Sequence, residues 1–140
     1  MPQPGQILYY QDFEFPDDHS KKDKLFVVLN DTDRNSVCLV LKTTSQSTRY
    51  EGTDKGCNPQ KKVFFVPTNW EHCFKVNTYI QLPQIFTIPV DTLLVGDISR
   101  KIYVTSSLTP ECLELLRNCL RQFKSDISEE HWKLIFSSRR

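Results

Sequence analysis

Short runs of Val, Ile, Phe, Tyr and Thr dominate the chain from residue 5 to about residue 105, and Asp, Asn, Pro or Gly separates them. Runs of this kind are typical of β-strands, because branched and aromatic side chains pack well on a pleated sheet. The sequence therefore predicts a mainly β protein. The expected strands span residues 6–15, 24–30, 36–44, 62–67, 78–82, 84–89 and 101–105.

The spacing of apolar residues changes from that of strands to that of helices in the last third of the chain. In 109–123 the apolar side chains recur on one helical face, and Thr109 stands where an N-cap is expected. A second helix is expected from Ser128, because two glutamates follow it in the first turn and apolar residues recur after them. The sequence thus predicts one or two C-terminal α-helices.

The size and charge of the chain limit its class. With 140 residues, 39% of them hydrophobic, we expect a single domain over 1–140, with a β-barrel at 5–105 and a helical segment at 109–140. The formal net charge is +1, so a contact with nucleic acid must come from a local patch. No apolar run approaches the roughly 18 residues of a membrane-spanning helix. The N-terminus lacks a signal-peptide pattern and the five cysteines are an odd number, which together predict a reduced, cytoplasmic protein without membrane contact.

Cations stand at the ends of two expected strands. Lys24 begins the run 24–30, and the run 36–44 ends in Lys42, Thr43 and Thr44. Ammonium and hydroxyl groups that converge in this way suit a phosphate. Two simpler explanations stay open: lysines beside an edge strand discourage pairing with another sheet, and threonines are ordinary strand residues.

A long connection follows at residues 45–60, and connections of this length are usually functional or disordered. Arg49, Lys55 and Lys61 lie in it or at its end, with Tyr50 among them. Cations interleaved with aromatic rings suit single-stranded nucleic acid, whose bases stack while its phosphates contact the cations. A solvated loop surface explains the same residues.

The motifs of the N-terminal third follow a recognisable order. "GQILYYQDFEF" is followed by a polar, charged loop, then by "KLFVVLN" and by "CLVLKTTSQSTRY". In this order the chain resembles the MazF/PemK (Kid) toxins of bacterial toxin–antitoxin pairs, over roughly residues 5–50. The resemblance implies an SH3-like small barrel, usually paired as a homodimer. It also implies a metal-independent endoribonuclease that needs no cofactor and cleaves single-stranded RNA by 2′-OH attack on the adjacent phosphate. A cognate antitoxin protein is then expected to cover the same groove.

The resemblance implies roles for individual residues. Lys24 takes the position of a basic residue at the start of the second strand, and Thr43 that of a hydroxyl at the end of the third. His19 lies in the loop where some members have a histidine, and its ordinary pKa suits proton transfer. We therefore expect Lys24, Thr43 and His19 to be catalytic, and Lys42, Thr44, Arg49, Lys55 and Lys61 to bind RNA. Since the family typically has Arg-Pro where this chain has Lys24-Leu25, the alternative is a non-catalytic SH3-like barrel that binds a protein or nucleic acid.

The cysteines give no metal signature. Cys57, His72 and Cys73 contain no Cys-x-x-Cys pair and do not supply four tetrahedral ligands, so no metal site is predicted. Cys112 and Cys119 fall on the apolar face of the expected helix, where we expect small core side chains. No Gly-rich phosphate loop is present, so nucleotide-binding classes that depend on one have no support.

Overall fold

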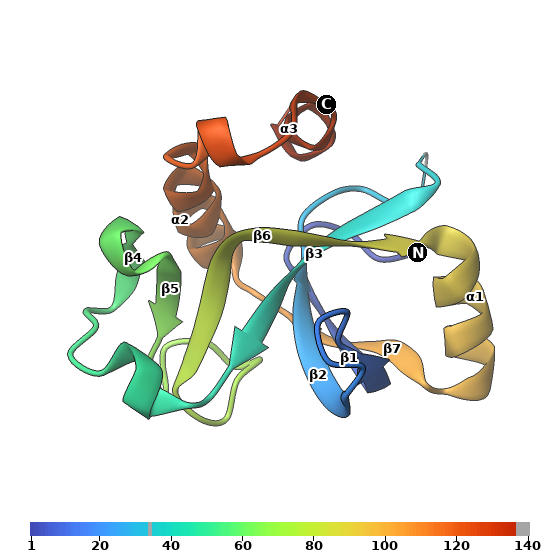
Figure 1. Ribbon diagram of the computed structural model, residues 1–140, viewed down its shortest axis with the longest axis horizontal. Coiled ribbons are helices and arrows are strands. Elements are labelled where there is room, and N and C mark those ends of the chain that lie inside the picture. The colour runs from blue at the N-terminus through green and yellow to red at the C-terminus, as the bar shows by residue number, and fades with distance from the viewer. Residues whose placement is uncertain (34, 137–140) are drawn as a thin grey trace.

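The computed structural model describes residues 1–33 and 35–136, in which one antiparallel sheet of seven strands carries three α-helices (Figure 1). The strands are β1 (Gln6–Glu14), β2 (Lys21–Val28), β3 (Val37–Thr44), β4 (Gly56–Asn58), β5 (Val63–Val66), β6 (Thr78–Pro89) and β7 (Ile102–Ser107). Their order in the sheet is β4-β5-β6-β3-β2-β1-β7. The prediction of a mainly β protein is therefore confirmed.

The sheet is open, which differs from the closed barrel that the sequence predicts. Closure requires the two outermost strands to pair with each other. The outermost strands here are β4 and β7, and within the described ranges β4 pairs with β5 and β7 with β1. The apolar faces of the sheet are covered by helices instead.

Side chains alternate along each strand, so the sheet has two apolar faces. One face, which includes Val27 and Leu41, packs against α2 (Pro110–Arg121) and α3 (Glu129–Phe136). The other face, which includes Phe26 and Val40, packs against α1 (Val90–Ser99) through Leu93. In Figure 1, α2 and α3 lie together beyond one side of the sheet, and α1 lies near its β7 end. None of the described helices is both long and apolar enough to cross a membrane.

The C-terminal helices form where the sequence predicts them. The Thr109 hydroxyl accepts a hydrogen bond from the Cys112 amide, which caps the start of α2. In the same way the Ser128 hydroxyl accepts a hydrogen bond from the His131 amide at the start of α3. The N-cap predicted at Thr109 and the second helix predicted from Ser128 are both confirmed.

Three of the described strands and α-helices differ from the prediction. Residues 78–89 form one strand, β6, where the sequence suggested two, and β4 forms inside the long connection. The helix α1 was missed because its apolar residues do not gather on one buried face. Leu93 is buried, whereas Leu94, Val95 and Ile98 are 49%, 68% and 84% exposed.

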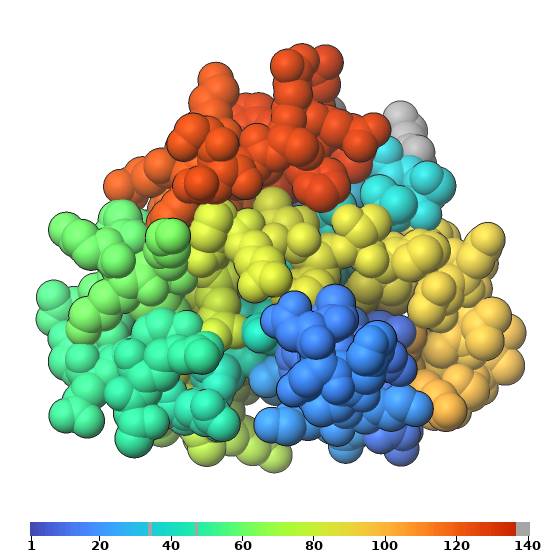
Figure 2. Space-filling view, in the orientation of Figure 1, coloured from blue at the N-terminus to red at the C-terminus, as the bar shows by residue number. Residues whose placement is uncertain are grey.

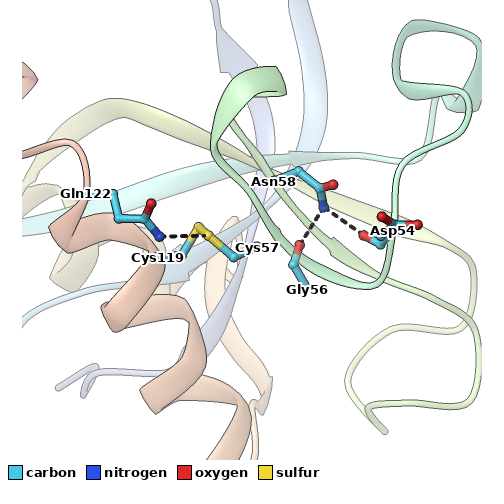
Figure 3. Close-up of a disulfide and its surroundings, with 6 residues drawn as sticks. All are labelled: Asp54, Gly56, Cys57, Asn58, Cys119 and Gln122. Atoms are coloured by element: carbon cyan, nitrogen blue, oxygen red, sulfur yellow. Dashed lines mark hydrogen bonds between the residues drawn. A yellow bond between two sulfur atoms is a disulfide. The ribbon is translucent and has the colours of Figure 1, made fainter.

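A disulfide joins Cys57 of β4 to Cys119 of α2 (Figure 3), and the two Cα atoms are 5.5 Å apart. The prediction of reduced cysteines is therefore wrong for this pair. The reason is that α2 packs across the sheet face next to β4 and brings together residues 62 positions apart in sequence. Cys38, Cys73 and Cys112 are free thiols, and burial raises the pKa of each to about 12.

Candidate functional site

A pocket of about 310 Å³ lies on the sheet face that carries Phe26 and Val40, in a part of that face away from α1. Its lining comes from the β1–β2 connection, from β2, β3 and β6, and from the 3₁₀ turn η1 (Ser47–Tyr50). Figure 2 shows the β1–β2 connection (blue) and the segment after β3 (teal) next to each other on the face toward the viewer. The chain thus brings two of its connections together over three neighbouring central strands, β6, β3 and β2.

Four cationic side chains line this pocket: Lys22, Lys24, Lys42 and Arg49. The sheet places the three lysines, because Lys22 and Lys24 are two residues apart on β2 and share a face. Lys42 is directly opposite Phe26 across the β2–β3 pair, which makes it a diagonal neighbour of Lys24. Arg49 is added by η1, after the chain turns at the end of β3. We call these four residues the cationic cluster.

Burial and repulsion between like charges weaken the hold of Lys24 and Lys42 on their protons. Burial lowers the pKa of Lys24 from its ordinary value, and the charges of Lys42 and Lys22 lower it further. Burial also lowers the pKa of Lys42, and the nearby Arg49 adds to that effect. A bound anion would relieve both effects, since it would offset the desolvation and screen the like charges from each other.

No ion pair neutralises the cationic cluster in the part of the chain that the structure describes. The Lys42 ammonium lies 5.0 Å from the centre of the Phe15 ring, and that of Lys24 lies 5.9 Å from the same ring. Rings of this kind attract cations, yet they carry no charge to cancel theirs. The pocket therefore keeps an excess of positive charge in partly buried positions.

Two carboxylates from the β1–β2 connection also line the pocket, those of Asp17 and Asp18. Asp18 accepts a hydrogen bond of 3.0 Å from the Ser20 amide, and this bond holds its pKa below the ordinary value. The charge of Asp17 acts on Lys42 and raises its pKa, against the effects of burial and of Arg49. With four cations and two carboxylates, the pocket is suited to an anion and also contains groups that accept protons.

Four of the residues predicted from the sequence meet in this pocket, namely Lys24, Lys42, Thr44 and Arg49. Thr43 does not line it. The Thr43 hydroxyl donates a hydrogen bond of 2.8 Å to the carbonyl oxygen of Leu25, and the residue is only 5% exposed. Because side chains alternate along β3, Thr43 faces the opposite side of the sheet from Lys42 and Thr44.

The three remaining predicted residues lie elsewhere. His19 has a side chain that is 77% exposed, and its Nδ1 is 2.8 Å from a carboxylate oxygen of Glu14. The Lys55 ammonium lies 4.5 Å from the centre of the Trp70 ring. The Lys61 ammonium donates to the carbonyl oxygen of Glu51 at 2.9 Å. None of the three is among the residues that line the pocket.

Sequence reasoning missed Lys22 and Gln81, which both line the pocket. Lys22 could have been found, because a residue two positions before Lys24 on a strand points to the same face. Gln81 had no such signal. It reaches the pocket because β6 pairs with β3, and that pairing joins segments almost forty residues apart in the chain.

Comparisons with known proteins give no assignment: no protein-family model matches the chain, and a search of curated proteins finds no match. Within residues 1–33 and 35–136, no three His, Cys, Asp or Glu side chains come together in a way that could hold a metal ion. The functional argument therefore depends on the geometry and charge of the pocket.

Proposed function

We propose that this chain binds single-stranded RNA at the cationic cluster and cleaves it without a metal, as an endoribonuclease similar to the MazF/PemK toxins. The observation that carries the proposal is the convergence of Lys22, Lys24, Lys42 and Arg49 in one pocket without an ion pair among the described residues. A phosphodiester supplies the negative charge that such a pocket lacks.

The cleavage proceeds by attack of a ribose 2′-oxygen on the adjacent phosphorus, while the bond to the 5′-oxygen of the next nucleotide breaks. Negative charge grows on the phosphate oxygens, and the ammonium groups of Lys24 and Lys42 stabilise it. Arg49 contributes a planar guanidinium that can hold two phosphate oxygens at once, which a lysine cannot do. In this proposal Arg49 supplies the guanidinium group that the family typically has at the position of Lys24.

Two protons move in the same reaction. The 2′-hydroxyl loses one to a base, for which the Asp17 carboxylate is the candidate in the pocket. The leaving 5′-oxygen gains one, and Lys24 is the candidate donor because its lowered pKa makes it more acidic than an ordinary lysine. The products are a 2′,3′-cyclic phosphate and a free 5′-hydroxyl.

The proposal includes the other properties that the family resemblance implies: an SH3-like fold, pairing into a homodimer, a cognate antitoxin protein and a cytoplasmic location. The antiparallel sheet with a C-terminal helical segment is compatible with such a fold, although the sheet is open. Growth arrest upon expression of the chain alone, relieved by an active-site variant, is the expected cellular result.

A second candidate function is RNA binding without cleavage. It is favoured by the positions of Thr43 and His19, since two of the three residues expected to do chemistry lie outside the pocket. In this case the cationic cluster holds the phosphates of an RNA strand that stays intact.

Incubation of the purified protein with a mixed-sequence RNA in EDTA distinguishes the two functions. Fragments with 2′,3′-cyclic phosphate ends that disappear in Lys24→Met but persist in the matched control Lys61→Met support the endoribonuclease. Lys61 serves as the control because it is an exposed lysine outside the pocket. Intact RNA with salt-dependent binding that Lys24→Met weakens supports the binding protein. No cleavage and no binding at low salt contradicts both.

A further inference from the structure

An aromatic stack borders the cationic cluster on the same face of the sheet. Tyr50 of η1 and Phe65 of β5 both stack on Tyr79 of β6, with ring centres 5.2 Å and 4.6 Å from that of Tyr79. The ring planes are inclined by 26° and 11°, so both contacts are close to parallel. Tyr79 is buried, and the stack holds Tyr50 in place at the end of the turn that also carries Arg49.

Gln81 lies two residues after Tyr79 on β6, so its side chain is on the same face, and it lines the pocket. Its Nε2 donates a hydrogen bond of 2.9 Å to the Tyr50 hydroxyl. Its Oε1 is buried and has no hydrogen-bond partner among the described residues. A buried amide oxygen without a donor is unfavourable, because it has lost its hydrogen bonds to water without replacing them.

The direction of the amide agrees with the charge around it. If the amide were turned over, its oxygen would accept from the Tyr50 hydroxyl, and an unpaired NH₂ group would be buried in its place on a residue that lines a pocket with four cations. The field of those cations favours the carbonyl oxygen, which carries the negative end of the amide dipole. The stack fixes Tyr50, and Tyr50 fixes the amide, so the acceptor is held in place before any ligand arrives.

We propose that Gln81, held by Tyr50, is a specificity-determining residue of this pocket. Its Oε1 accepts a hydrogen bond from a donor on the nucleotide whose phosphate the cationic cluster binds. This inference rests on the proposed function, because it takes the ligand to be a nucleotide. The donor is the ribose 2′-hydroxyl or an exocyclic amine of the base, which both lie within one nucleotide of the phosphate and offer the same hydrogen-bond chemistry.

Uncleavable mononucleotides test the inference. Adenosine and cytidine 3′-monophosphates carry both donors, their 2′-deoxy forms lack the sugar donor, and purine riboside and 2-pyrimidinone riboside 3′-monophosphates lack the amine. We expect the wild-type protein to bind one of these two altered sets about fivefold to tenfold more weakly than the parent nucleotides, as measured by NMR titration. The altered set that binds more weakly identifies which donor contacts Gln81.

The variant Gln81→Leu is expected to bind parent and altered nucleotides equally. Gln84→Leu is the matched control, since Gln84 is an exposed glutamine on the same strand outside the pocket. Tyr50→Phe keeps the ring but frees the amide, so it is expected to reduce the preference. This variant also provides a second reading should Gln81→Leu not fold.

The outcomes separate this inference from the proposed function. If inorganic phosphate and the nucleotides all fail to bind the wild-type protein at low salt, the proposed function is wrong and this inference falls with it. If phosphate binds but the wild-type protein shows no preference among the nucleotides, the inference alone is wrong. A preference that persists in both Gln81→Leu and Tyr50→Phe also overturns it.

Discussion

Removal of the disulfide between Cys57 and Cys119 is expected to destabilise the protein by about 4 kcal/mol. The magnitude follows from the 62 residues that separate the two cysteines, because the cross-link restricts a loop of this length in the unfolded chain. The folded state also loses its covalent link between α2 and the edge strand β4, which has three residues and, within the described part of the chain, pairs with β5 and no other strand. Cys119 is 1% exposed and stays in the core as a free thiol.

Urea unfolding of the wild-type protein and of Cys57→Ser, each with and without a reductant, measures the loss of stability and controls for other effects of the reductant. The wild-type protein should lose stability when a phosphine reductant is added, whereas Cys57→Ser should be less stable from the start and insensitive to the reductant. The difference between oxidised and reduced wild type gives the free energy of the cross-link. A change below about 1 kcal/mol, well under the usual range for a natural disulfide, would refute the reasoning, as would free thiols at both positions by mass spectrometry.

Three further predictions concern the pocket and the sheet. Because burial lowers the pKa of Lys24 and Lys42, RNA affinity should fall as pH rises through these lowered values, before the ordinary lysine pKa of about 10.5 is reached. The same shifts predict that folding stability rises with pH in that window, since the unfolded chain then binds more protons than the folded protein. An RNA affinity that stays constant up to pH 10.5 contradicts the assignment of these two lysines to the binding site. Arg49→Ala should weaken RNA binding about tenfold in a filter-binding assay and reduce the slope of log affinity against log salt by about 1. An equal effect of Lys61→Ala would show that the RNA does not bind specifically at the cationic cluster. Thr43→Val leaves the Leu25 carbonyl oxygen without its donor, so thermal or urea unfolding should show a loss of about 1–2 kcal/mol with RNA affinity unchanged, and weaker binding at wild-type stability would place the hydroxyl in the site after all.

Strand and helix content could be predicted because it depends on local composition and on caps such as Thr109. The closure of the sheet could not, because it depends on which distant strands meet at the edges. The cross-link between Cys57 and Cys119 was missed for a similar reason, since it depends on where α2 packs. α1 escaped detection because its exposed side chains are as apolar as its buried ones.

The candidate site could be predicted in part. Lys24 and Lys42 were found because they stand near the ends of the strands that the sequence predicts, although β2 begins at Lys21 and places Lys24 inside the strand. Thr43 and Thr44 were both expected in the site, but neighbouring residues of a strand point to opposite faces, and of these two only Thr44 lines the pocket. The sequence pattern did not fix which face is polar at this position. Gln81 could not be found at all, since its place depends on the pairing of β3 with β6.

The most direct test of the central claim is a crystal structure of the protein with a short single-stranded RNA that carries 2′-O-methyl groups and cannot be cleaved. We expect a phosphate of this RNA within hydrogen-bond distance of Lys24, Lys42 and Arg49, on the sheet face away from α2 and α3. An RNA strand bound elsewhere on the molecule, with the cationic cluster free of phosphate, would contradict the assignment of this pocket.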